Sequence, residues 1–348
     1  MIHQYTISAL RPGMKLGNDA ITENGKKVLA KHTVLTKWMI ERLQEWGCLI
    51  VDIFEESPSS PENKQQSYID QHAKIVKSLG DAFTHTRHFK EVPISRLQDI
   101  ANSTIKTLLS FNSVISFLHL INNNDDYTFR HSLNVAVIAG VVGKWLQYSE
   151  DQIKDLVLAG LLHDIGKTGI PLDILNKPGK LTAQEMDVMK QHSRLGYELI
   201  VREKEINSLV KEAILQHHER LDGSGYPKNL LKHDISRIAS IIAVADTYDA
   251  MTSHRVYRDA LTPLSVMEEL LQEMFEKLDA EICLLFINHT KEALIGSFVR
   301  LSNGIEGKIV FMNKQNTIEP IIQVANGHYI DLKNEKNLQI LACIPDLT

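Results

Sequence analysis

Apolar residues recur at helical spacing from about residue 67 to residue 290, and this pattern constrains the fold more than any other feature. Glycine and proline cluster between the apolar stretches, at 166–180 and 223–227, where we expect helices to end. The expected helices cover residues 133–146, 153–162, 185–201, 206–217, 238–248 and 266–275. The sequence therefore predicts a bundle of packed helices in this region.

Residues 1–55 carry a mixed pattern that predicts a small α+β accessory domain. Asn24-Gly25 lies between two short apolar runs and is typical of a hairpin turn. Thr36 is placed to cap a helix that ends at Gly47. We expect the apolar face of this helix to form the domain's own core, with a regulatory or dimerisation surface as the alternative.

The other boundaries follow from composition. Residues 56–66 are polar and contain two prolines, which is typical of a linker. We expect a helical catalytic domain at 67–290 and a small β domain at 291–348, where short β-like runs are separated by Asn303-Gly304 and Asn326-Gly327. The predicted fold class is mainly α: a helical bundle flanked by a small N-terminal α+β domain and a small C-terminal β domain.

The charge and the apolar content exclude several kinds of partner. The formal net charge is −5 with a pI near 6.3, so no overall positive field exists to hold DNA or long RNA. No stretch reaches about 18 apolar residues, the length that membrane insertion needs, and the N-terminus lacks the apolar region of a signal peptide. Three scattered cysteines suit a reducing compartment. We expect a cytoplasmic protein.

Histidine is unevenly distributed along the chain. Seven of the 15 histidines fall between residues 131 and 254, which makes that segment the first place to seek a metal site. His163 and Asp164 stand side by side at the end of an expected apolar helix. His217 and His218 continue an apolar stripe toward the core, where buried ring nitrogens need partners. A structural hydrogen-bonded pair is the alternative there, and metal ligation is favoured.

Further candidate ligands lie on similar apolar stripes. Asp246 follows Ile238 and Ile242 at helical spacing, and a carboxylate on an apolar face is rarely left unpaired. His131 opens one apolar helix, and His192 lies within another. Together the candidates supply five imidazoles and two carboxylates. This set suits two first-row metals about 3.5–4 Å apart, bridged by a carboxylate and a hydroxide.

These motifs resemble the HD-GYP family of cyclic di-GMP phosphodiesterases, which belong to the HD superfamily of metal-dependent phosphohydrolases. The matching segments are HDIGK at 163–167, HHERLDGSGYP at 217–227 and DTYDAMTSHRVYR at 246–258. The resemblance covers roughly residues 100–290 and implies an HD-type helical bundle. It places one metal on His131, His163, Asp164 and Asp246, and a second on Asp164, His192, His217 and His218. Iron or manganese is favoured by the family, and zinc stays open.

The resemblance also implies a number of metals. Family members with a third metal carry a glutamate four residues before the first histidine, where this chain has Tyr127. A phenol is a poor substitute for a carboxylate ligand, so we expect two metals. Asp249 belongs to the shared motif, and we expect it to have a structural role or to contact a metal ligand rather than a metal.

Substrate contacts are implied in the same way. Asp164 and Lys167 are the expected catalytic residues, with Lys167 contacting a phosphate or assisting the leaving group. The expected substrate-binding residues are Lys167, Arg255, Arg258, Gly225, Tyr226 and Pro227. The Gly-Tyr-Pro loop borders the substrate site in the family and is a candidate surface for a homodimer or a signalling protein.

The implied activity is hydrolysis of cyclic di-GMP to linear pGpG by a metal-bridging hydroxide, with GMP as a further product. Two alternatives stay open. One is hydrolysis of another cyclic dinucleotide, such as cyclic GMP-AMP. The other is a cyclic-dinucleotide sensor without turnover, although all seven ligand positions are intact. Glu292-Ala293-Leu294 spells the motif of another phosphodiesterase family, and we attribute this short match to chance.

Overall fold

A computed structural model describes residues 2–22, 25–54, 61–110, 127–253, 261–313, 317–325, 327–335 and 337–344. The chain divides into two compact units, Met1–Tyr68 and Ile69–Thr348, which are treated separately below. Among the described residues, no helix combines the length and the apolar character needed to cross a membrane.

The N-terminal unit is a small α+β structure. β1 (Ile2–Thr6) pairs antiparallel with β4 (Ile50–Phe54), and β2 (Ala20–Ile21) pairs antiparallel with β3 (Lys27–Leu29). The second pair confirms the predicted hairpin, although Asn24 itself lies outside the described residues. A short 3₁₀ helix, η1 (Ile7–Ala9), follows β1.

The helix of this unit, α1 (Lys37–Glu45), begins as the sequence predicts. The Thr36 hydroxyl accepts a hydrogen bond from the Met39 amide at 3.2 Å, and Gly47 follows the helix with a φ of 75°. Leu43 is buried with Leu16 and Leu35 in the core of the unit, and Met39, Ile40 and Trp46 pack against that core. The apolar face of the helix is therefore its own domain's core.

Two long helices open the helical body. α2 (Pro61–Phe89) is followed by α3 (Ile94–Ser110). α2 begins at Pro61, so the helix includes the second half of the polar segment 56–66. Proline is well suited to the first helical position, because its missing N–H would be unpaired there anyway.

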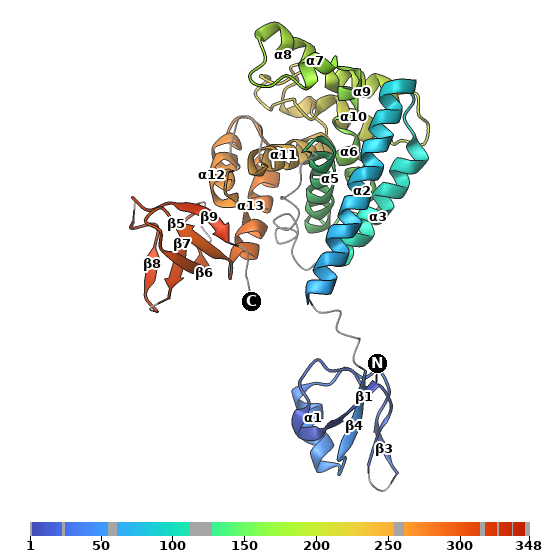
Figure 1. Cartoon of the computed structure of the whole chain (residues 1–348), viewed down its shortest axis with the longest axis vertical. Coiled ribbons are helices and arrows are strands. Elements are labelled where there is room, and N and C mark those ends of the chain that lie inside the picture. Colours follow the sequence, from blue (N-terminus) through green and yellow to red (C-terminus); the bar gives the residue numbers. More distant parts are fainter. Residues whose placement is uncertain are drawn as a thin grey trace. The chain divides into compact units, whose positions relative to one another are not determined.

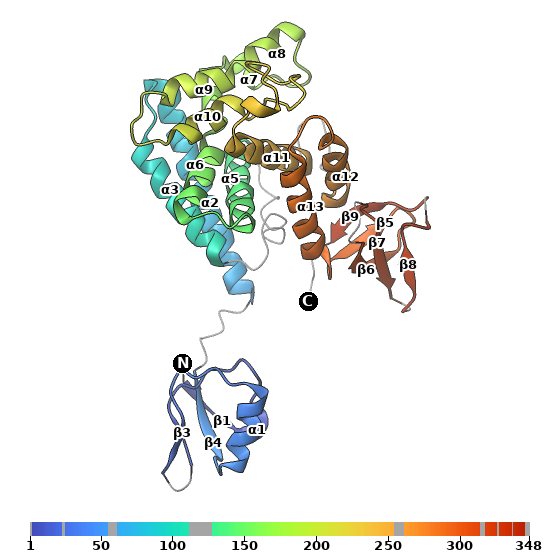
Figure 2. The same ribbon diagram turned by 180° about the vertical axis from the view of Figure 1, so that it is seen from behind.

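α5 (Tyr127–Trp145) is the central helix and is buried along most of its length. It contacts α6 (Glu150–Leu162), α11 (Arg237–Thr252), α3 and α13 (Ala280–Leu294). In both ribbon views α5 lies between α6 and α11 (Figures 1 and 2). α5 and α6 cross closely at Gly160, where an added Cβ would lie 2.4 Å from the Cα of Ala136. This crossing brings the end of α6 beside the start of α5.

The middle of the chain supplies shorter elements around this pair. They are η2 (Ile165–Gly169), α7 (Leu172–Leu175), α8 (Ala183–Lys190), α9 (His192–Ile200), α10 (Ser208–Gln216), η3 (Lys232–Asp234) and α12 (Pro263–Glu273). The single helix expected over residues 185–201 is wrong, because α8 and α9 meet at a break. There the Gln191 amide donates to the carbonyl of Val188, three residues back, which tightens the turn. The break redirects the chain at His192.

The C-terminal residues form a five-stranded antiparallel sheet in the order β8-β7-β6-β5-β9. Its strands are β5 (Phe298–Leu301), β6 (Glu306–Met312), β7 (Pro320–Val324), β8 (Tyr329–Asp331) and β9 (Ile340–Ile344). The predicted turn at Gly304 joins β5 to β6 with a φ of 83°, whereas Asn326 lies outside the described residues. The mainly α class with a small C-terminal sheet is confirmed.

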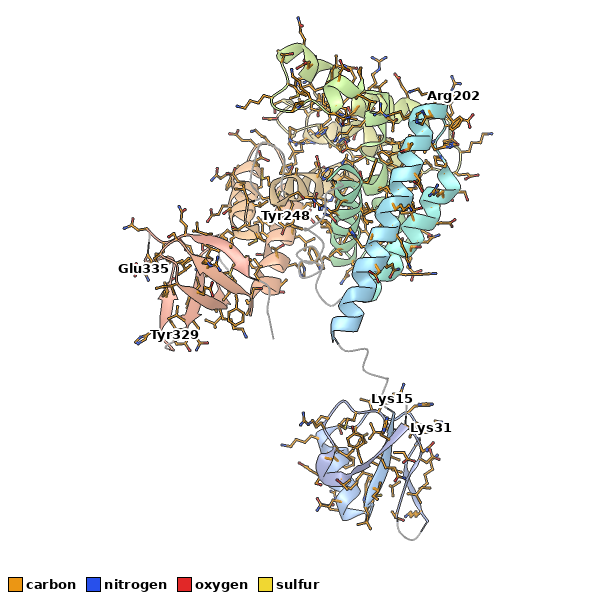
Figure 3. The ribbon with its side chains drawn as sticks, in the orientation of Figure 1. Lys15, Lys31, Arg202, Tyr248, Tyr329 and Glu335 are labelled. Carbon is orange, nitrogen blue, oxygen red and sulfur yellow. The ribbon has the colours of Figure 1, made fainter. Side chains whose placement is uncertain are left out.

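The sheet belongs to the same compact unit as the helices. Val299, Ile309 and Ile322 are buried in one core with Leu294 of α13, and both views show the sheet beside α13 (Figures 1 and 2). Figure 3 shows Tyr329 on the side of the sheet away from the helices, and that side chain is exposed. The sheet therefore covers one end of the bundle and contributes none of the seven candidate ligands.

Candidate metal centre

The structure brings the seven predicted ligands together from five helical elements. His131 lies in the first turns of α5, and His163 and Asp164 follow α6 directly. The remaining side chains come from the start of α9, the end of α10 and the buried face of α11: His192, His217, His218 and Asp246. Six of the seven residues are buried, and the His218 side chain is 22% exposed.

The candidate ligand atoms form two groups. Ligand atoms of His131, His163 and Asp164 lie within 4.8 Å of one another, and so do those of His192, His217 and His218. Each group has the size of a single metal site. The described residues therefore provide two groups that could each hold a metal ion.

Asp164 lies between the two groups. Its Oδ2 atom is 3.3 Å from Nε2 of His163 and 3.8 Å from Nε2 of His131. Its Oδ1 atom is 3.4 Å from Nε2 of His192, in the other group. One carboxylate thus presents an oxygen to each group, which is the geometry of a bridging ligand.

Asp246 also faces both groups. Its Oδ1 atom is 3.1 Å from Nε2 of His131, and its Oδ2 atom is 3.8 Å from Nδ1 of His218. The family resemblance assigns Asp246 to the first metal alone. The geometry adds an approach to His218 that the sequence did not indicate.

Backbone carbonyls orient three of the histidines in the same way. Nδ1 of His163, His192 and His217 lies 2.8 Å from the carbonyl oxygen three residues earlier in each case. A carbonyl only accepts, so Nδ1 carries the proton and Nε2 has a free lone pair. The local helical turn therefore sets the tautomer that a metal ligand needs.

The buried ring nitrogens of the centre are arranged as ligands for cations. Nε2 of His192 and Nε2 of His217 face each other at 3.2 Å, although both nitrogens are acceptors in this tautomer. Nε2 of His163 is buried and makes no hydrogen bond within the described residues. Two buried lone pairs that face each other without a hydrogen-bond donor are energetically unfavourable. A cation bound by both nitrogens would satisfy them. Mixed imidazole and carboxylate donors suit divalent first-row metals.

The electrostatics favour ligand protonation states at most positions. Burial holds the pKa of His217 and His218 well below 6.5, and it also lowers the pKa of His192. Burial alone would raise the pKa of Asp164, but the nearby Lys167 and His163 outweigh it and hold that pKa well below 3.8. Neutral imidazoles and ionised carboxylates are the forms that bind metal.

His131 is the exception. Burial lowers its pKa, but hydrogen bonds to Asp246 and Asp249 outweigh this and raise the pKa to about 9. Nδ1 of His131 lies 2.7 Å from Oδ2 of Asp249, which is also buried. Asp249 thus contacts the candidate ligand His131 and not the proposed metal position, as the shared motif implies. A cation at Nε2 would displace a proton there.

The 3₁₀ turn η2 carries Lys167 against the centre. Its ammonium Nζ is 2.6 Å from Oδ2 of Asp164. The sequence did not indicate what holds this turn: Arg87 of α2 donates to the carbonyls of Lys167 at 2.8 Å and of Ile170 at 2.9 Å. A side chain 80 residues away in sequence therefore fixes the turn.

The Gly-Tyr-Pro loop lies at the His218 side of the centre. The Tyr226 ring is 4.7 Å from the His218 ring, centroid to centroid. Gly225 is buried and Pro227 is half-buried. Glu219, which the sequence analysis missed, accepts hydrogen bonds from the amides of residues 228 and 230 at 2.7 and 2.9 Å. Its only sequence signal was its position directly after His217-His218.

Three predicted residues cannot be placed. Arg255 and Arg258 lie outside the described residues. Tyr127 is the first residue of α5, and its side chain is also outside them. The structure therefore leaves the basic pair and the third-metal position as sequence predictions.

The match to known proteins agrees with this geometry. Residues 116–282 match the HD domain family. The described part of this segment contains all seven candidate ligands. The resemblance to HD-GYP proteins is thereby confirmed, and the HD domain supplies the helical bundle predicted from sequence.

Several characterised relatives contain a similar domain. The chain is 29% identical over 259 residues to "Cyclic di-GMP phosphodiesterase PA4108" of Pseudomonas aeruginosa, covering 73% of this chain and 62% of that protein. It is 38% identical over 182 residues to "Cyclic di-GMP phosphodiesterase" of Thermotoga maritima, covering 51% and 49%. It is 40% identical over 143 residues to "3'3'-cGAMP-specific phosphodiesterase 2" of Vibrio cholerae, covering 41% and 27%. The chain thus spans less than two thirds of each relative.

A solved structure shares the fold. "Bd1817, a HDG"Y"P protein from Bdellovibrio bacteriovorus" aligns with a TM-score of 0.51 and 16% sequence identity. The alignment covers 84% of this chain and 100% of that chain. At this identity the likeness shows the fold alone, and it agrees with an HD-type bundle.

Proposed function

We propose that this protein is a metal-dependent phosphodiesterase that hydrolyses cyclic di-GMP to linear pGpG. The observation that carries the proposal is Asp164, whose two oxygens face the two histidine groups while Lys167 contacts one of them. Relatives of the HD domain named as cyclic di-GMP phosphodiesterases supply the substrate class.

The proposed ligands follow the two groups. One cation would be held by His131, His163, Asp164 and Asp246, and the other by Asp164, His192, His217 and His218. When bound, two divalent cations lower the pKa of a coordinated water toward about 7 and neutralise charge on the phosphate. Iron or manganese is our proposal for both positions, because the donors are imidazoles and carboxylates and the HD-GYP family favours these metals.

Lys167 is the proposed proton donor and phosphate contact. The side chain is 25% exposed at the edge of a centre whose other groups are buried, so substrate can reach it. In hydrolysis, the bond between phosphorus and the ribose 3′ oxygen breaks, and that oxygen must gain a proton. The Lys167 ammonium is positioned by Asp164 to hold a proton near the reacting phosphate and to offset its charge.

The Gly-Tyr-Pro loop is the proposed wall of the substrate site. Tyr226 covers His218 with an aromatic face, and a purine base can stack on such a ring. We keep Arg255 and Arg258 as proposed phosphate contacts, since a guanidinium offers two parallel donors to a phosphodiester. Homodimer or signalling-protein contacts through this loop, and a cytoplasmic location, remain part of the proposal.

The proposed main product is pGpG. Tyr127 stands where a third-metal glutamate would be, so we infer two metals and a reaction that stops mainly at the linear product. A second candidate substrate is cyclic GMP-AMP. The relative in Vibrio cholerae named for that ring favours it, because the metal chemistry is the same for either ring.

The test is an anaerobic turnover assay with ferrous or manganous ion that separates cyclic di-GMP, pGpG and GMP by chromatography. A parallel reaction contains cyclic GMP-AMP at the same concentration. The His163→Ala/Asp164→Ala double variant is the control. The proposal predicts pGpG from the intact protein alone. Metal-loaded protein that cleaves neither ring would contradict it and leave the sensor alternative.

A further inference from the structure

Asn134 is a buried polar side chain that the proposed reaction does not use. It lies on α5, and its exposed fraction is 1%. Its Nδ2 atom donates to Oδ1 of Asp249 at 2.8 Å. The other oxygen of that carboxylate, Oδ2, is 2.7 Å from Nδ1 of His131 and 3.4 Å from the Ser253 hydroxyl. Asn134 thus contacts the carboxylate of Asp249, which binds the Nδ1 side of the His131 ring.

This support differs from that of the other histidines. His163, His192 and His217 each rely on a backbone carbonyl that their own helical turn holds in place. His131 relies on a side-chain carboxylate, which can rotate unless its second oxygen is also held. Asn134 holds that second oxygen, and it lies three residues after His131 on the same helix face. His131 and Asn134 of α5 therefore each contact one oxygen of the Asp249 carboxylate on α11.

We propose that Asn134 is a positioning residue for the cation bound through His131. Its amide fixes the direction of Asp249, and Asp249 fixes the His131 ring and increases the basicity of Nε2. The effect is confined to the group of His131, His163 and Asp164. The proposal rests on the proposed function, because it requires that the centre holds metal.

A merely structural role for Asn134 makes a different prediction. A general loosening of the bundle would weaken both groups of ligands. Thr104 provides a matched control, because it is 1% exposed and its hydroxyl donates within its own helix, to the carbonyl of Ile100 at 2.8 Å. Thr104→Val removes a buried hydrogen bond of the same unit without contacting the centre.

The experiment is a titration of the metal-free full-length protein with Mn²⁺, in which free Mn²⁺ is followed by its electron paramagnetic resonance signal. Asn134→Leu removes the amide at similar volume, and Asn134→Asp replaces the donor with an acceptor. We expect the Kd of one of the two sites to increase by about 10–100-fold in both variants. The Kd of the other site should stay within about twofold of its wild-type value, and so should both Kd values of Thr104→Val. A change of this size is the scatter expected for substitutions that are independent of a site.

Two further backgrounds assign the affected site. In His131→Ala, Asn134→Leu should weaken Mn²⁺ binding no further, because the ligand that it positions is gone. In His218→Ala, Asn134→Leu should cause its full loss at the remaining site. Non-additivity of this kind identifies residues that act through one another.

The outcomes separate the two proposals. Wild-type protein that binds no Mn²⁺ would overturn the proposed metal centre. If the wild type binds Mn²⁺, unchanged affinity in both Asn134 variants would overturn the positioning role alone. Equal weakening of both sites, or equal losses in the His131→Ala and His218→Ala backgrounds, would overturn it too. A variant that does not fold counts as a structural role and also contradicts the proposal, unless the other Asn134 variant folds and shows the selective loss.

Discussion

Gly166→Ala should disturb the centre more than any other one-carbon change in the described part of η2. A Cβ at Gly166 would lie 1.8 Å from the carbonyl oxygen of His192 and 2.4 Å from the amide nitrogen of Gly196. Ordinary contact begins near 3.4 Å, so η2 and α9 would have to separate by about 1.6 Å. The contact between Asp164 and His192, now 3.4 Å, crosses this joint.

The size of the effect follows from this geometry. Overpacking a core costs about 1–3 kcal/mol, and a clash between two backbones belongs at the upper end. A loss of about 3 kcal/mol lowers the Tm by about 6–12 °C for a unit of this size. A displacement of about 1 Å at the reacting groups costs about 100-fold in kcat.

The assay compares Gly166→Ala with Gly143→Ala by thermal melting, Mn²⁺ affinity and turnover. Gly143 is a matched control, because an added Cβ there would meet the flexible end of Leu156 at 2.6 Å, away from the centre. We expect Gly143→Ala to keep metal affinity and turnover. If Gly166→Ala keeps wild-type affinity and turnover, the tight joint between η2 and α9 does not position the ligands.

Three other outcomes follow from the same structure. Replacing Lys167 by Met should lower kcat by about 100-fold with little change in Tm, because the side chain is 25% exposed; a wild-type kcat would exclude its role. Saturation with Mn²⁺ at about 100 times Kd should stabilise the protein by about 2.7 kcal/mol for each occupied site and raise its Tm by about 5–10 °C per site, whereas an unchanged Tm would contradict ligation in the folded state. In metal-free protein, burial lowers the pKa of His217 and His218, so the unfolded chain binds more protons in acid and stability should fall below pH 6.5. The raised pKa of His131, about 9, acts in the opposite sense, so its contribution is complete below pH 6.5 and is lost toward pH 9. A Tm that increases when the pH is lowered from 6.5 to 5 would refute these assignments.

The sequence predicts that the seven candidate side chains come together, because they lie on apolar stripes of helices that pack on one another. Periodicity places a side chain on the buried face of a helix, and a histidine or aspartate there needs a partner. Asp246 illustrates this, since Ile238 and Ile242 of the same stripe are buried beside it in α11. The start of α1 at Thr36 and the strand turn at Gly304 were predictable for a similar local reason, because capping and turn chemistry act within a few residues.

What the sequence did not predict depends on contacts between distant segments. The break at Gln191 preserves the apolar spacing, so periodicity gave no sign that α8 and α9 separate. Arg87 and Asn134 are ordinary helical residues until the fold places them against η2 and Asp249. The second approach of Asp246, toward His218, likewise depends on how α10 packs on α11.

The metal content of the protein tests the central claim most directly. Protein loaded anaerobically with Mn²⁺ and freed of excess ion is analysed for metal per chain, beside Asp164→Ala prepared in the same way. A centre in which Asp164 joins two histidine groups predicts two ions per wild-type chain and a loss of at least one in the variant. One ion or none in the wild type, or two retained by Asp164→Ala, would contradict the account.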